Sequence, residues 1–252
     1  MSKAPLVFLL LLGATPQEDK KGPPDPKPRV FMALPLAISP GARVQVTLRG
    51  LNLDQASEVR FAGPTQGATI ALKSKGKAES PKESDPAVCG NTQLDLELTL
   101  PESFPAAGVG LVAVSPKGEA AYELKVVAKD KLVSEKEPNG GFATAQAVEA
   151  GQTIQGSIGQ AMDVDVFKIS GKRGETWILD VEAQRRGSVL DGLLTLRDAG
   201  GHIVATSDDS ESSRDPSLKV KLPKDGCYLI TLIDANNSGG ATHPYLLHVR
   251  RD

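Results

Sequence analysis

Acidic and amide side chains gather at the ends of apolar segments in the second half of the chain. The run Ser134–Gly140 reads Ser-Glu-Lys-Glu-Pro-Asn-Gly, and Asp163 and Asp165 precede an apolar stretch. Carboxylate, amide and backbone oxygens are the ligands that Ca²⁺ prefers, and the ion takes about 6–8 of them. Asp163 and Asp165 share strand parity with Phe167 and Ile169, so we expect them on the core side of a strand. Buried carboxylates are costly unless a counter-charge neutralises them, and a bound cation would do so.

Other acidic residues and the histidines give weaker indications of chemistry. Asp208-Asp209-Ser210-Glu211 and Asp215 form a second acidic loop, which we expect to be a solvated hairpin tip. The chain has three histidines and neither a His-Glu-x-x-His nor a Gly-x-Ser-x-Gly motif. His248 alternates with Tyr245 and Leu247, so it is expected on the outer face of a strand. No catalytic residue is predicted, although spacing does not exclude a Ser/His/Asp triad, because triads assemble in space.

Period-two alternation of apolar residues predicts an all-β chain. The alternating segments are residues 43–49, 94–100, 122–126, 177–183, 218–222, 228–232 and 245–249. Half-buried strands separated by Gly, Asp, Asn and Ser turns are typical of β-sandwiches. We therefore expect two β-sandwich domains, over residues 29–128 and 129–252, with the charged stretch 129–137 as a hinge between them.

The N-terminal residues predict export. Lys3 precedes the apolar run Leu6–Leu12 and small residues, which indicates a signal peptide over residues 1–14, too short to span a bilayer as a helix. Residues 15–28 are rich in proline and predict an extended linker. The mature chain is expected to be secreted or periplasmic and to have no membrane span. A net charge of −2 and 4% aromatic residues argue against a nucleic-acid partner.

The two cysteines of the chain, Cys89 and Cys227, fall in different expected domains. A disulfide would tie the domains together, but two cysteines alone do not define a disulfide framework. We expect two unpaired thiols, with Cys227 packed in a strand as a small hydrophobic residue.

The first domain resembles a known family. Pro40-Gly41, the segment Val44–Leu53 and the triplet Val59-Arg60-Phe61 follow the order "PG…V.V.G.N" and "V.F". This order is similar to the start of an IPT/TIG domain. The resemblance implies an immunoglobulin-like sandwich over residues 29–128, used for spacing or for protein contact.

The second domain resembles the bacterial pre-peptidase C-terminal (PPC) domain almost continuously over residues 134–250. The matching segments are Glu137-Pro138-Asn139, Gly151–Ile169, Leu190–Gly200, Asp208-Asp209, Pro223, Gly226, Tyr228 and Tyr245–Leu247. The resemblance implies a jelly-roll-like sandwich. A signal peptide followed by IPT-like and PPC-like domains is similar to small exported proteins of planctomycete-type bacteria.

The PPC resemblance also implies a calcium site, because related collagen-binding modules hold calcium near the start of the domain. By position, the implied ligands are Glu135, Glu137, Asn139, Asp163 and Asp165. The family has an aspartate after the asparagine, where this chain has Gly140, so one expected ligand is missing. The alternative is that Glu137-Pro138-Asn139 is an exposed turn and both aspartates lie in solvent.

These resemblances imply a secreted, non-catalytic binding or accessory module, since PPC domains usually accompany secreted peptidases. Its expected partners are a protein, a polysaccharide or a cell-envelope component. One alternative is a hydrolase with acidic catalytic residues, which needs a cleft that raises the pKa of one acid. The other alternative is a purely structural spacer.

Overall fold

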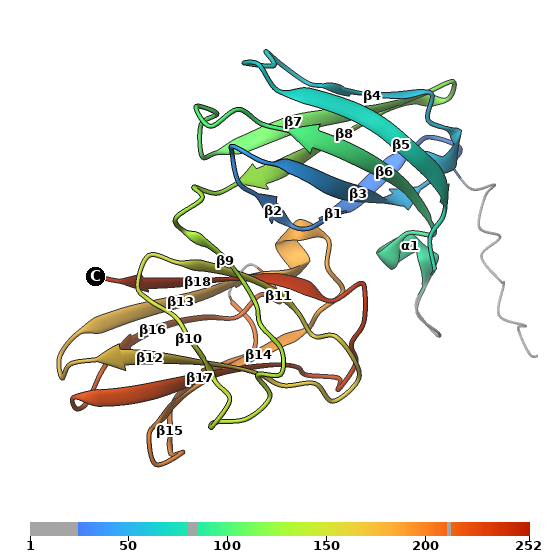
Figure 1. Ribbon diagram of the computed structural model, residues 1–252. Helices are drawn as coiled ribbons and strands as arrows, with labels where there is room; N and C mark the ends of the chain where they lie inside the picture. Colours follow the sequence, from blue (N-terminus) through green and yellow to red (C-terminus); the bar gives the residue numbers. More distant parts are fainter. Residues whose placement is uncertain (1–24, 80–84, 211–212) are drawn as a thin grey trace, which may run out of the picture.

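The computed structural model describes residues 25–79, 85–210 and 213–252, which form two stacked β-sandwich domains (Figure 1). This confirms the expected all-β class. The predicted signal peptide, over residues 1–14, and the linker as far as residue 24 lie outside the described residues.

Helical structure within the described ranges is confined to single turns. These are the α-helix α1 (Pro86–Cys89) and the 3-10 helices η1 (Leu53–Gln55) and η2 (Gln184–Arg186). In the part of the chain that the structure covers, no helix is both long enough and apolar enough to cross a membrane.

The first domain packs one four-stranded sheet on another. One sheet has the order β1 (Arg29–Leu34), β3 (Arg43–Leu51), β6 (Thr92–Thr99), β5 (Thr69–Lys77). The other has the order β2 (Ala37–Ile38), β8 (Gly118–Val126), β7 (Gly108–Ser115), β4 (Glu58–Phe61). The alternation along β6 explains why the sheets pack face to face. Leu94, Leu96 and Leu98 are buried between the sheets. Asp95, on the outer face, accepts hydrogen bonds from the Thr47 and Ser74 hydroxyls.

The second domain packs two five-stranded sheets. One has the order β10 (Gln146–Ala147), β12 (Asp165–Gly171), β17 (Gly226–Asp234), β14 (Gly192–Asp198), β15 (Ile203–Ser207). The other has the order β16 (Ser217–Lys221), β13 (Thr176–Glu182), β18 (Pro244–Arg251), β11 (Thr153–Ser157), β9 (Leu132–Ser134). The core holds the aromatic residues Phe167, Trp177, Tyr228 and Tyr245, all nearly inaccessible to solvent.

The chain enters the second domain as a strand, β9. β9 pairs in parallel with β11, with Leu132 opposite Thr153, and β11 pairs antiparallel with β18. The Glu135 N–H continues the ladder by donating to the Gln155 carbonyl at 2.9 Å. Part of the stretch 129–137, which was expected to be a hinge, is instead an edge strand of the second domain, whereas residues 129–131 form the turn that precedes it.

Two expectations about single residues are also corrected. Asp215 is buried rather than solvated, because its carboxylate accepts hydrogen bonds from the backbone N–H groups at the start of η2; Asp208 and Asp209 are exposed as expected, and Glu211 lies outside the described residues. Both cysteines are free, but Cys227 is exposed and does not pack in the core, which its neighbour Tyr228 fills instead.

Candidate metal centre

The site lies at one end of the second sandwich, where strands from both sheets bring acidic side chains together. Glu135 directly follows β9, and Asp165 is the first residue of β12 in the opposite sheet. Glu135 is held by its Oε2, which accepts from the Ser157 N–H at 2.9 Å, and by its Oε1, which accepts from Asn139 Nδ2 at 2.8 Å. Glu137 is held in the same loop, where its Oε2 accepts from the Asn139 N–H at 2.7 Å.

Tyr245 of β18 joins the two sheets at this site. Its hydroxyl oxygen lies 2.8 Å from Glu135 Oε1 and 2.7 Å from Asp165 Oδ2. A hydroxyl has one proton to donate, so it satisfies one of these carboxylates at a time. The other short contact is favourable only if that carboxyl is itself protonated or if both oxygens bind the same cation.

The electrostatics of the cluster are unbalanced. Glu135, Glu137 and Asp165 have carboxylate oxygens within 4.8 Å of one another. In the described ranges, none of the three forms an ion pair with a basic side chain. Burial, together with the negative charge of Glu135, raises the pKa of Asp165 to about 9. Burial and the same two carboxylates raise the pKa of Tyr245 well above its usual value.

Two oxygen atoms of the cluster have no hydrogen-bond partner among the described residues. Asn139 Oδ1 and Asp165 Oδ1 are buried and accept no hydrogen bond from any described residue. Buried polar atoms are nearly always satisfied, so each such exception needs an explanation. Together with the carboxylates of Glu135 and Glu137 they form a set of oxygen donors only, which suits a hard cation such as Ca²⁺. The residues present therefore fit the ion that the sequence predicted.

Four of the five residues predicted as ligands meet at this point, and Asp163 does not join them. Its carboxylate accepts from the Gly159 N–H at 2.7 Å and from the Val164 N–H at 3.0 Å, in the turn before β12. Its charge nevertheless adds to the field that raises the pKa of Asp165. Asp163 is thus a neighbour of the cluster and is occupied in holding the turn.

Sequence reasoning placed Tyr245 only in the core and missed its polar contacts. A buried tyrosine hydroxyl almost always has a partner, and this requirement is a signal that could have found it. Gly140, where the PPC family has aspartate, is exposed at the edge of the site. A Cβ atom at this position would lie 3.3 Å from the Val164 carbonyl oxygen, so any side chain there would be in close contact with the Val164 backbone.

Comparison with known proteins gives partial similarities. No family model matches the sequence. A probable subtilase-type serine protease of Deinococcus radiodurans is 36% identical over 103 residues, which make up 40% of this chain and 14% of that protein. The chain therefore matches only a small part of this curated relative.

Two solved structures show the same kind of partial similarity. The pre-peptidase C-terminal domain of collagenase from Bacillus anthracis aligns with a TM-score of 0.36 at 16% identity, covering 46% of this chain and 100% of that one. SGBP-B from the mixed-linkage glucan utilization locus of Bacteroides ovatus, solved with a mixed-linkage heptasaccharide, aligns with a TM-score of 0.29 at 12% identity, covering 89% of this chain and 73% of that one. TM-scores this low do not assign a family or a function.

Proposed function

We propose that this chain is an exported, non-catalytic accessory module whose second domain is a PPC-type sandwich completed by Ca²⁺. Its partner is a protein, a polysaccharide or a component of the cell envelope. One observation carries the proposal: the carboxylates of Glu135, Glu137 and the buried Asp165 converge, and no basic side chain among the described residues pairs with them. Two buried oxygens of this site, Asn139 Oδ1 and Asp165 Oδ1, have no hydrogen-bond partner among the described residues.

A divalent cation accounts for each unusual feature of the site. It would supply the missing positive charge and give Asn139 Oδ1 and Asp165 Oδ1 a partner. It would also join the Glu135–Asn139 loop, which follows β9 of one sheet, to Asp165 at the start of β12 in the opposite sheet. Binding to the native state alone stabilises the fold, and stabilisation is therefore the expected effect of the ion.

The test is thermal melting of the full chain in EGTA, in Ca²⁺ and in Mg²⁺. At a Ca²⁺ concentration of about 100 times the Kd, the ion should stabilise the native state by about 2.7 kcal/mol, and the midpoint should rise with concentration. Mg²⁺ should have a much smaller effect, because it demands octahedral geometry and dehydrates reluctantly. An unchanged midpoint in millimolar Ca²⁺ would remove the metal from the proposal.

The hydrolase alternative receives no specific support from the position of the carboxylates. A cavity of about 660 Å³ in the second domain is lined by Lys168, Trp177, Cys227 and Arg251, with Glu149 as its one acid. Glu135, Glu137 and Asp165 do not line it. A paired-carboxylate hydrolase needs both acids in a substrate cleft.

The binding role and the spacer alternative are separated by co-sedimentation of the full chain. The chain is mixed with insoluble cell-envelope material or insoluble polysaccharide, with Ca²⁺ or with EGTA, and centrifuged. A binding module should sediment with one of these materials, and the Asp165→Asn variant should lose any part of the binding that depends on Ca²⁺. A chain that stays in the supernatant with every material, while still responding to Ca²⁺ in melting, would be a spacer.

A further inference from the structure

The two domains meet over a small apolar cluster. Leu36, Ala37 and Val127 of the first domain pack against Leu246 and Leu132 of the second. Beside them the Ala37 N–H donates to Gln155 Oε1 at 2.8 Å. Relative motion of domains is expected unless their interface is large and hydrophobic, and this cluster is small. Polar contacts must therefore contribute if the domains are held at one angle.

An ion pair crosses the junction and joins Lys125, near the end of β8, to Glu182, at the end of β13. Lys125 Nζ lies 2.7 Å from Glu182 Oε1, and the two side chains are only 20% and 15% exposed. Ion pairs with so little exposure are screened by salt much less than surface pairs. The same carboxylate binds Arg186 Nε at 2.8 Å and His248 Nε2 at 3.3 Å, both within the second domain. These contacts, with Lys125, keep the pKa of Glu182 well below its usual value, although burial alone would raise it.

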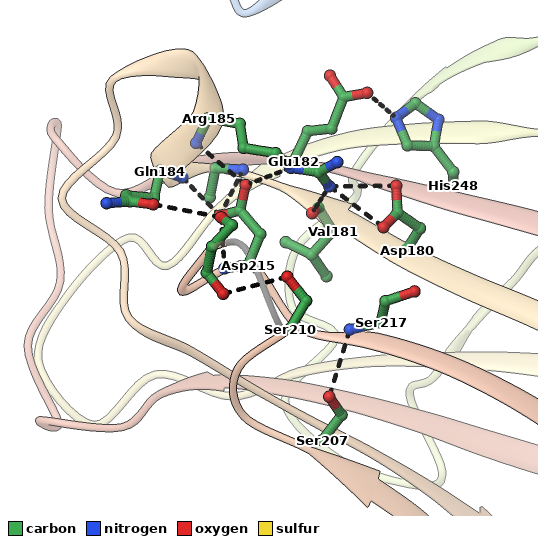
Figure 2. Close-up of polar contacts among 12 residues, drawn as sticks. Asp180, Val181, Glu182, Gln184, Arg185, Ser207, Ser210, Asp215, Ser217 and His248 are labelled. Atoms are coloured by element: carbon green, nitrogen blue, oxygen red, sulfur yellow. Dashed lines mark hydrogen bonds and ion pairs between the residues drawn. The ribbon is translucent and has the colours of Figure 1, made fainter.

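Glu182 lies beside the hydrogen-bonded segment formed by the end of β13 and the start of η2, shown in Figure 2. The buried Asp215 carboxylate accepts from the Gln184 N–H at 2.6 Å and from the Arg185 N–H at 3.0 Å, which fixes the start of η2. Arg185 is held between Asp215, at 2.8 Å, and Asp180, at 3.1 Å. Just beyond η2, the backbone of Gly187 lies against β1: a Cβ there would be 2.0 Å from the Phe31 carbonyl oxygen.

We propose that the Lys125–Glu182 ion pair is a latch that locks the two domains into one rigid body, so that the chain presents both domains to a partner at a fixed angle. When the Lys125–Glu182 pair breaks, the Glu182 carboxylate still has partners, because Arg186 and His248 continue to bind it. Opening would expose the apolar cluster around Leu36. The Ca²⁺ site uses none of these residues, so the latch stands independently of the proposed function.

The test measures the distance between the domains in the full chain by pulsed electron paramagnetic resonance. One spin label is attached to Cys227, which is exposed, and the other to the exposed turn of the first domain through Lys117→Cys; Cys89 is buried and should not label. With the latch intact we expect one narrow distance distribution. Lys125→Met keeps the apolar stem and removes the charge, and should cause loss of the narrow peak.

The matched control is Arg60→Met, which breaks the 2.8 Å pair of Arg60 with Glu119, an exposed contact within the first domain. It should leave the narrow peak unchanged. Glu182→Gln, as a second variant, should broaden the distribution as Lys125→Met does. Circular dichroism and a cooperative thermal unfolding transition establish that each variant is folded. A broad distribution with the latch intact, or a narrow and unshifted one in folded Lys125→Met, would overturn the proposal.

Discussion

The second domain contains two clusters of carboxylates that differ in their counter-charges. Glu182 is surrounded by Lys125, Arg186 and His248, which lower its pKa, whereas Asp165 has acidic neighbours and a raised pKa of about 9. Both clusters group three potential metal-ligating side chains within 4.8 Å. Proximity of acids is therefore a poor indicator of a metal site, and the absence of a paired base within the described residues is the informative difference.

The two clusters would respond differently to an added cation. Glu182 already pairs with Lys125, Arg186 and His248, so an added cation would compete with these partners. The Glu135–Asp165 cluster has an excess of negative charge and two unpartnered oxygens, so adding a cation would complete it. Four predictions follow from this difference, beginning with the one that should change stability most.

Glu182→Ala should destabilise the full chain by about 3 kcal/mol, because removing one partner of a largely buried network leaves the basic groups uncompensated. Denaturation in urea, monitored by circular dichroism, measures the free energy of unfolding. Glu119→Ala, which removes the exposed partner of Arg60, is the control and should change stability by no more than about 0.5 kcal/mol. Equal effects of the two substitutions would show that the Glu182 network contributes no more than a surface ion pair.

Asp165→Asn should abolish the stabilisation by Ca²⁺, about 2.7 kcal/mol at 100 times the Kd, while leaving stability in EGTA unchanged or slightly higher. The amide oxygen still accepts a hydrogen bond from the Tyr245 hydroxyl, and the amide resembles the protonated carboxyl that a pKa of about 9 implies in the absence of metal. Melting in EGTA and in Ca²⁺ gives both values. Asp163→Asn is the comparison, since its carboxylate holds a turn; it should keep most of the Ca²⁺ response. A full Ca²⁺ response in Asp165→Asn would contradict the assignment of Asp165 as a ligand.

The contribution of Glu182 should depend on pH in a defined direction. Because its pKa is lowered in the folded state from an ordinary value of 4.5, its stabilisation is complete above that pH and is lost as the pH falls below it. The difference in unfolding free energy between the native chain and Glu182→Gln should therefore shrink by about 1 kcal/mol between pH 6 and pH 3. Urea denaturation at both pH values measures it, and the other carboxylates cancel in the difference. A constant difference would mean that the acid is not selectively stabilised in its charged form.

Gly140→Asp should have the smallest effect, a Ca²⁺ affinity about threefold tighter, equivalent to about 0.7 kcal/mol. The substitution restores the aspartate that the PPC resemblance implies at this position. The gain is limited because the Cβ would approach the Val164 carbonyl oxygen to 3.3 Å. Calorimetric titration of the full chain measures the affinity, with Gly140→Asn as the uncharged control. Weaker Ca²⁺ binding by Gly140→Asp would indicate that the new side chain displaces the loop and adds no ligand to the site.

The fold was largely predictable because each domain places one apolar face of each strand inward. The alternation of Leu94, Leu96 and Leu98 with polar residues identifies β6 and its buried face directly. Strand order and the role of β9 were not predictable, since a charged stretch beside a three-residue edge strand has the composition of a linker. The IPT/TIG-like identity of the first domain stays a prediction.

The candidate site was predictable where its residues are close in sequence and unpredictable where they are not. Glu135, Glu137 and Asn139 lie in one loop, and strand parity correctly placed Asp165 inside. Strand parity predicted the wrong position for Asp163, because this residue lies before the strand begins. It is part of a turn, in which its carboxylate accepts a hydrogen bond from the Gly159 N–H. Tyr245 is 110 residues from Glu135, and Lys125 is 57 residues from Glu182, so only tertiary structure reveals these contacts.

The pairing of β9 with β11 determines where the second domain can be separated from the first. A fragment that begins after Ser134 would lose β9 and leave the backbone N–H and C=O groups of β11 open along one side. Open sheet edges readily pair with other chains and promote aggregation. Proteolysis after this strand would therefore release a fragment that is prone to aggregate. Proteolysis before Leu132 would release a fragment whose β11 edge is still covered by β9.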